Sequence, residues 1–397
     1  MREIHSSHLG LLAASHGMNH VYQLIPPVIM PEIARDYGLS AITAGLLLSC
    51  FYLSYALLPV VSGCLSQIFS RKYLLTLGFA INAISFLAIG LTRNVVLLAL
   101  LFFAAGAGGS TYHPNGAPLL AETYQTGRGG ALGLHQTGGA IGSVVGPILT
   151  GFLVLNLTWN NTLVILAFPG IILAGTLWFL IGSKQSAEKN SKPQKIRLGQ
   201  LKNYGSVALM LAAAFIYVLG LRGTDAFAST YFVEGRGIQN FFEASLLFAS
   251  LKVSGLFSAP ICGRLSDMYS RKRVLIILVV IESASLYAIT VTPVALLIIP
   301  CVIFGFAAFG LLGVGEALLA DITPEDQRSI IFGLNYTISF SSSILLAPAL
   351  FAIAGIYNFN TGFIMLSALM PFSIPILLKV KSKETPKKKA TSQYTKD

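Results

Sequence analysis

The chain has 397 residues, of which 54% are hydrophobic and only 11% are charged, and its mean hydropathy is +0.72. Soluble globular domains carry about 25% charged residues, so this composition excludes a soluble protein. The net charge is +11, but the placement of the basic residues, described below, argues against a nucleic-acid-binding surface.

Apolar runs of about 20 residues, long enough to cross about 30 Å of hydrocarbon, occur twelve times along the chain. None shows the ten-residue alternation of a membrane β-strand, so we predict helices. The fold class is therefore an all-α membrane protein with twelve transmembrane helices. The predicted spans are 7–33, 41–68, 73–92, 95–122, 130–156, 162–183, 203–232, 241–267, 273–292, 294–321, 329–355 and 361–379.

The basic residues are distributed unevenly over the predicted loops. Arg35, Arg93 and Arg236 fall in odd-numbered loops, and Arg222 and Lys252 fall inside predicted helices. The other Lys and Arg residues lie at the N-terminus, in or beside even-numbered loops, and in the C-terminal tail. By the positive-inside rule, we expect both termini to be cytoplasmic and the protein to lie in the cell membrane. The first apolar stretch lacks an A-x-A-like exit, so we expect it to remain as the first helix rather than act as a signal peptide.

A polar string interrupts the chain twice. "GCLSQIFSRKY" begins at Gly63, and "GRLSDMYSRKR" begins 200 residues later at Gly263. A repeat at half the chain length predicts two homologous halves, a known plan among transporters. We expect two pseudo-symmetric six-helix bundles at 1–183 and 202–380, a cytoplasmic linker at 184–201, and a basic tail at 381–397.

The repeated string resembles G-x-L-x-D-x-x-x-R-[KR], the signature turn of the major facilitator superfamily. The resemblance implies alternating access driven by an ion gradient. It also implies that the turn contacts the other half of the protein and so stabilises one end state of the transport cycle. Gln67 stands where the acid of the first copy is expected. We therefore expect Asp267, near the start of the fifth helix at Gly130, to form the main contact between the two halves, which we call the latch. Alternatively, Asp267 faces water. The expected latch residues are Gly63, Gln67, Arg71, Gly263, Asp267 and Arg271.

The fifth predicted helix carries a regular set of glycines, "GLHQTGGAIGSVVGPILTG". Gly133, Gly142, Gly146 and Pro147 resemble the fifth-helix motif of the superfamily's antiporters, with Thr150 in place of one closing glycine. Glycines four apart form a groove for a neighbouring helix, and proline permits a bend. The motif favours antiport; the alternative is tight packing with no bearing on direction.

The first and fourth helices resemble the fosmidomycin-resistance branch, in "SHGMNHVYQLIPPVIMPEI" and "GAGGSTYHPNGAPLLAE". His16, Asn19 and His113 match that pattern. His20 stands where an Asp is expected, and Asn115 where a Glu is expected. Both differences remove acids, so the proton site of that branch is not carried over to this chain.

Ionisable residues inside membrane helices cost about 2.5–3.5 kcal/mol each and indicate functional sites. Arg222 and Asp225 form either a self-neutralising pair or part of a gate, and Lys252 needs Asp225, Glu316 or an anionic substrate as a partner. The resemblance implies that helices 1, 4, 7 and 10 line a central cavity. We assign proton coupling to Glu316, Asp225 and His113, although Glu316 is alternatively a static ion-pair partner. The expected cavity residues are His16, Asn19, His20, His113, Asn115, Arg222, Asp225, Lys252 and Glu316.

His16 and His20 are four residues apart on one helix face. With His113 they are suited to bind a transition metal, to relay protons, or to hold structure through hydrogen bonds; we assign no metal site.

No P-loop, HExxH or nucleophile elbow is present, so we predict no enzyme and no cofactor. The function that fits best is proton-coupled export of a small drug-like or anionic organic compound by a monomer in a lipid bilayer. The alternatives are uptake of an organic anion with protons, transport of a transition metal or its chelate, and a receptor that does not transport.

Overall fold

The computed structural model describes residues 2–124, 127–181, 204–324 and 327–381, and within these ranges the chain is helical with no strand. The linker expected at 184–201 and the tail beyond residue 381 lie outside the described residues. The first seven helices are α1 (Arg2–Tyr37), α2 (Ala41–Leu65), α3 (Arg71–Leu91), α4 (Val95–Ser110), α5 (Tyr112–Thr123), α6 (Arg128–Asn156) and α7 (Trp159–Leu180).

The remaining elements include one π-helical segment, η2, and two 3₁₀ turns, η3 and η5. They are α8 (Tyr204–Thr230), η2 (Tyr231–Gly235), α9 (Phe241–Val253), α10 (Gly255–Met268), α11 (Arg271–Val291), η3 (Val294–Leu296), α12 (Ile298–Ile322), α13 (Arg328–Ile356), α14 (Phe359–Leu369), η5 (Met370–Phe372) and α15 (Ser373–Lys379).

The all-α membrane fold class is confirmed. Over the described residues, eleven helical segments are long and apolar enough to cross a membrane, and each coincides with a predicted span. The twelfth prediction, 7–33, falls within α1, which is long enough but is not among the eleven. Its stretch from His16 to Gln23 places four polar side chains in the middle of the helix, and these lower its hydropathy.

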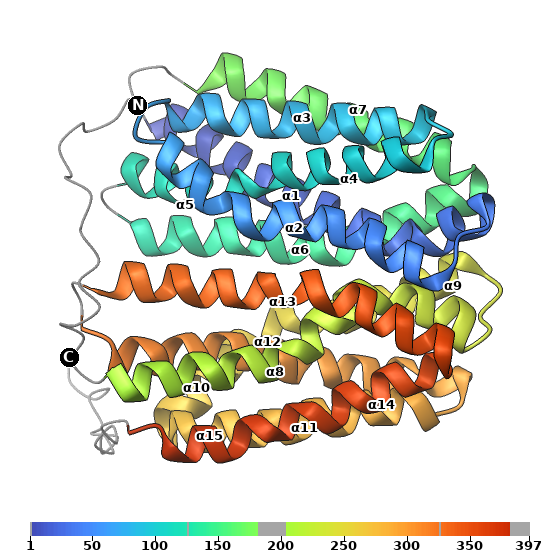
Figure 1. Cartoon of the computed structure of the whole chain (residues 1–397). Coiled ribbons are helices and arrows are strands. Elements are labelled where there is room, and N and C mark those ends of the chain that lie inside the picture. Colours follow the sequence, from blue (N-terminus) through green and yellow to red (C-terminus); the bar gives the residue numbers. More distant parts are fainter. Residues whose placement is uncertain (1, 125–126, 182–203, 325–326, 382–397) are drawn as a thin grey trace, which may run out of the picture.

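The helices form two bundles, visible in Figure 1 as the blue-to-green and the lime-to-red halves. In the first bundle α1 packs on α6, α3 on α7 and α2 on α4; in the second α11 packs on α12, α8 on α13 and α10 on α12. The bundles meet along α2 with α13, α6 with α9, and α1 with α8. The two-bundle arrangement predicted from the repeat is therefore present.

Three predicted spans are each divided between two α-helices in the structure. Span 95–122 is divided at Thr111 between α4 and α5, and span 241–267 is divided at Ser254 between α9 and α10. Span 361–379 is divided by η5 between α14 and α15. Pro114 lacks the N–H that would continue the ladder across the first break, and Thr111 instead donates its hydroxyl to the Gly108 carbonyl at 2.9 Å. This break sets the direction of α5 and of His113.

The bundles approach most closely toward one end, which we call the far end; the opposite end, which carries the turns at Gln67 and Asp267, we call the turn end. A Cβ at Gly45 in α2 would lie 2.9 Å from the Pro348 Cα in α13. Ser229 donates to the Val28 carbonyl at 2.9 Å. Arg35 pairs with Glu234 at 3.6 Å. These contacts join the two bundles toward the far end.

Candidate functional site

A buried charge cluster lies in the second bundle beside the interface. Asp225 accepts from Arg222 Nη1 at 3.2 Å and also forms a short ion pair with Lys252 Nζ. All three side chains are at most 10% exposed. Ser339 adds a hydroxyl 3.3 Å from Arg222 Nη2. Asp225 is therefore the shared counter-ion that permits two cations to be buried, and the pairing expected for Lys252 is present.

Aromatic rings connect this cluster to the first bundle. The Arg222 guanidinium stacks on Phe340 of α13, 4.0 Å from the ring centroid. The Phe340 ring lies 5.6 Å from Tyr55 of α2, and the Tyr55 hydroxyl accepts from Asn19 Nδ2 at 3.2 Å. The expected cavity residues Asn19 and Arg222 thus face the same central region from opposite bundles.

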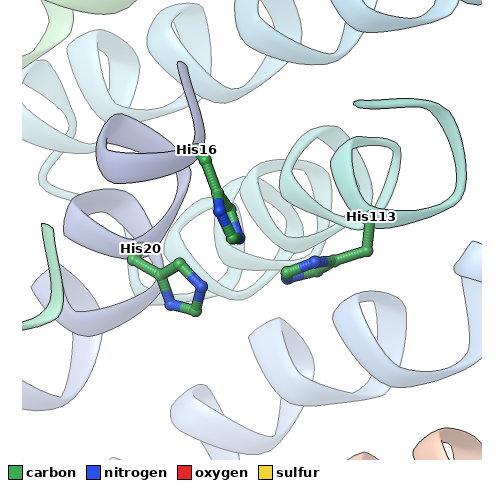
Figure 2. A group of neighbouring side chains, drawn as sticks. All are labelled: His16, His20 and His113. Carbon is green, nitrogen blue, oxygen red and sulfur yellow. The ribbon is translucent and has the colours of Figure 1, made fainter. Parts of the chain in front are cut away.

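Three histidines converge on the first-bundle side of this region. Figure 2 shows the rings of His16 and His20, from α1, and of His113, from α5, pointing toward one another. One nitrogen from each ring lies within 4.8 Å of the other two, and the ring centroids are 4.9–5.6 Å apart. The i,i+4 spacing on α1 and the break before α5 together produce this convergence.

A hydrogen-bond chain behind the histidines fixes the orientation of His16. His16 Nδ1 lies 2.8 Å from the His135 carbonyl of α6, which only accepts, so Nδ1 carries the proton. Tyr112 donates its hydroxyl to the Leu12 carbonyl at 2.6 Å and therefore accepts from His135 Nε2 at 3.0 Å. The lone pair of His16 Nε2 is left facing the other two histidines.

Two further carboxylates lie in the second bundle. Glu316 of α12 has Tyr336 as a hydrogen-bond partner, and the described residues show no ion pair between it and Lys252 or Arg222. Glu282 of α11 is fully buried, and neither of its oxygens has a hydrogen-bond partner in the described part of the chain. Both carboxylates interact electrostatically with Tyr217 of α8.

Asn115, two residues beyond His113 on α5, binds α2 and its own helix. It is fully buried, and its amide donates to Ser62 Oγ at 2.9 Å and to the Thr111 carbonyl at 2.8 Å. It ties α5 to α2 and extends no group toward Arg222 in the structure.

Two glycines of the fifth-helix motif, Gly142 and Gly146, face α1. A Cβ at Gly142 would overlap the Gly17 backbone, and one at Gly146 would lie 3.0 Å from the Val21 Cα. One at Gly139 would lie 2.6 Å from the His16 ring. Gly133 has open space around its Cβ position among the described residues. The groove, which Pro147 follows directly after Gly146, therefore seats α1 and makes room for His16.

The two signature turns form matching ion pairs within their own bundles. Arg71 binds Glu122 at 2.9 Å, and Arg271 binds Asp321 at 2.8 Å. Asp267 is 68% exposed and pairs with Arg271 at 3.3 Å.

The other latch positions lie open at the same end. Gln67 is exposed, and Gly63 lies near Pro114. Neither Gly263 nor Gly130 has another described residue within 4 Å of its Cβ position. Among the described side chains, the ion-pair partner of Asp267 is Arg271 of its own turn, and the latch between Asp267 and the start of α6 stays a prediction.

Sequence reasoning missed the residues that join the clusters. Tyr55, Phe340 and Ser339 are common residue types in apolar helices, and nothing in their local pattern distinguishes them. His135 could have been identified as a candidate from the sequence, because a histidine beside the glycines of the fifth helix is unusual in so apolar a stretch. Glu122 and Asp321, which partner Arg71 and Arg271, stand at matching helix ends in the two halves.

Comparison with known proteins agrees with this architecture. The model of the Major Facilitator Superfamily matches residues 12–269 and 240–396. The "Multi-drug resistance efflux pump PmrA" of Streptococcus pneumoniae is 24% identical over 361 residues, covering 87% of this chain and 88% of that protein. The "Fosmidomycin resistance protein" of Escherichia coli is 24% identical over 369 residues, covering 82% of this chain and 88% of that protein.

Solved transporters share the fold. A bacterial homologue of the human lysosomal transporter Spinster, in an inward-facing and occupied conformation, superposes with a TM-score of 0.77 at 17% identity and 94% coverage of both chains. The nucleoside transporter NupG superposes with a TM-score of 0.77 at 14% identity, covering 94% of this chain and 99% of that one. The two bundles, the paired turns and the family match over nearly the whole length show that this chain belongs to the Major Facilitator Superfamily and is a transporter, not an enzyme.

Proposed function

We propose that the chain is a proton-coupled secondary active transporter that exports a small anionic or drug-like organic compound by alternating access. The observation that carries the substrate class is the cluster of Arg222, Asp225 and Lys252, in which two buried cations share one carboxylate. The remaining positive charge favours an anionic group, because a buried charge needs a counter-charge. The names of PmrA and the fosmidomycin resistance protein support export.

In this proposal the protein works as a monomer in the lipid bilayer of the cell membrane, with both termini in the cytoplasm. Glu316 is the proton-coupling carboxylate, since it is partly buried and has a hydroxyl rather than a cation as its partner. Asp225 and His113 are the other groups suited to carry the proton. When the far end opens, Asp267 holds the turn ends of the two bundles together.

Uptake of an organic anion together with protons is the second candidate, favoured by the same excess of positive charge. The direction of the driving gradient separates the two. An antiporter loads vesicles when their lumen is acidic, whereas a symporter loads them when the outside is acidic.

The test is substrate-driven proton flux in proteoliposomes with a pH-sensitive dye inside, using a panel of organic anions and lipophilic drugs. We expect flux in the wild type, loss of flux in Glu316→Gln, and retention in Glu243→Gln, whose side chain is exposed at the start of α9. Undiminished flux in Glu316→Gln would remove Glu316 from proton coupling. No proton movement with any compound would reject coupled transport of these classes.

A further inference from the structure

The three-histidine cluster has the features of a metal site. All three ligand nitrogens lie within 4.8 Å of one another, and the nitrogens of a tetrahedral site with Zn–N bonds of 2.0–2.1 Å are about 3.4 Å apart. Small rotations of the side chains bridge that difference. Neither His16 Nε2 nor His113 Nε2 has a hydrogen-bond partner within the described ranges, although both atoms are buried.

The surroundings prepare His16 to act as a ligand. Metal-binding histidines usually donate their second ring N–H to a carbonyl or carboxylate, which fixes the tautomer and leaves the other nitrogen free for the metal. His16 makes this contact through Nδ1 to the His135 carbonyl at 2.8 Å. The His135 ring stacks on His16 with centroids 4.1 Å apart, and Tyr112 holds His135 in place at 3.0 Å.

The charge balance specifies the rest of the coordination shell. Three neutral imidazoles leave a bound divalent ion with its full double charge. Across the interface, the Arg222 guanidinium stacks on Phe340, and the centroid of the Phe340 ring lies 6.5 Å from that of His113, so a cationic side chain borders the site. A double positive charge in this position requires an anion on the metal.

We propose that His16, His20 and His113 bind one divalent transition-metal ion of the Zn²⁺ and Co²⁺ type and leave one coordination position open for an anionic ligand. Imidazole nitrogens suit these ions, whereas Mg²⁺ and Ca²⁺ prefer oxygen. Three protein ligands and one open position form the arrangement of sites at which the metal receives an exchangeable ligand. Ion binding is measured without transport, so its failure is distinguished from failure of the proposed transport activity. A metal ion on His113 excludes that residue as a proton carrier and leaves proton coupling to Glu316 and Asp225.

The experiment is a titration of purified, tag-free protein in detergent with Co²⁺, followed by visible absorption. Cys64, which is exposed, is replaced by Ser throughout to remove a competing ligand. We expect one Co²⁺ per chain, with the intense bands of four-coordinate cobalt. Azide, a small anionic ligand, is expected to shift these bands by filling the open position, and Zn²⁺ is expected to displace the cobalt.

Variants assign the bands to the site. His20→Gln and His113→Gln are expected to abolish saturable binding. The control is His8→Gln, which is expected to bind as the wild type does. Among the hydrogen bonds of the described chain, the His8 ring contacts only the Leu180 carbonyl. Tyr112→Phe removes only the hydroxyl that contacts the His135 ring, one step beyond the carbonyl that holds His16, so it is expected to weaken binding less than the roughly 10- to 100-fold that loss of a ligand's own outer hydrogen bond costs.

Size-exclusion profiles and thermal unfolding identify any variant that fails to fold. If one of the two histidine variants fails to fold, the other one tests whether the site binds the metal. Binding that persists in folded His20→Gln or His113→Gln would overturn the proposal. So would the absence of saturable Co²⁺ binding by the wild type. A spectrum that azide leaves unchanged would overturn the open coordination position.

Discussion

At the scale of single residues, Asp225 stabilises the second bundle. It is the common partner of Arg222 and Lys252, all three at most 10% exposed. Removing one member of a buried ion pair leaves an uncompensated charge, which costs more than the pair contributes. The same three residues form the proposed anion site, so stability and function depend on one carboxylate.

We expect Asp225→Asn to lower the free energy of unfolding by about 3–5 kcal/mol, because both cations lose their counter-charge. Replacing Lys252 by Met in the same chain removes one of the cations and is expected to restore part of the loss. The measurement is denaturant unfolding in mixed micelles, with Glu243→Gln as the control. Equal unfolding midpoints for Asp225→Asn and the wild type would contradict the role of Asp225 as shared counter-ion.

At the scale of secondary-structure elements, the glycine groove of α6 determines where α1 lies. Without side chains at Gly142 and Gly146, the backbones of α1 and α6 approach closely, as in other small-residue membrane interfaces. Gly139 adds space for the His16 ring. The motif that the sequence associates with antiport is therefore also the support of the histidine cluster.

Adding one methyl group tests this packing. Gly142→Ala places its Cβ into the Gly17 backbone, so α1 must shift, and we expect a loss of about 1–3 kcal/mol in the free energy of unfolding. Gly133→Ala on the same helix meets open space among the described residues and is the matched control. If the two variants unfold alike in mixed micelles, the groove does not determine the position of α1.

The turn between α10 and α11 carries Asp267, whose proposed role is tested by the rate of transport rather than by unfolding. Asp267 is largely exposed and, among the described residues, has its ion pair with Arg271 of the same turn, and exposed ion pairs contribute little to stability. We therefore expect Asp267→Asn to unfold as the wild type does but to transport more slowly, since the latch is needed in another conformation. Transport at the wild-type rate in proteoliposomes would show that Asp267 merely faces water.

At the scale of the whole molecule, the close contacts described between the bundles lie toward the far end, and two glycines of the turn end have open space around their Cβ positions. Gly45 meets Pro348, and Arg35 reaches Glu234, in the half of the molecule away from the signature turns. At the turn end, Gly130 and Gly263 have no described neighbour within 4 Å of their Cβ positions. This asymmetry is what alternating access requires of one of its end states.

A disulfide at the far end tests this mechanism. A Cβ at Gly355 lies 3.6 Å from the Ala41 Cβ, within the Cβ–Cβ range of a disulfide. In a chain with its four native cysteines replaced, we expect Ala41→Cys with Gly355→Cys to cross-link on oxidation and to stop transport. Reduction is expected to restore transport, and each single-cysteine variant serves as a control. Full activity of the cross-linked protein would contradict opening of the far end.

The sequence alone determined the fold class, the approximate helix bounds and the twofold repeat. A membrane helix must satisfy its backbone within itself, so hydropathy and length are local properties that can be read along the chain. The i,i+4 pair His16–His20 and the i,i+3 pair Arg222–Asp225 were predictable for the same reason, because helix geometry fixes which side chains share a face.

Only the tertiary structure decided which faces meet. Packing between helices distant in sequence depends on shape, and local pattern does not specify it. It brings His113 to His16 and His20, Lys252 to Asp225, and Phe340 between Arg222 and Tyr55. It also brings the Asn115 amide to Ser62 of α2 and leaves Asp267 exposed. The sequence determined which polar and ionisable side chains lie within the membrane helices. The packing of α1, α5 and α6, and of α8, α9 and α13, decided which of these side chains meet.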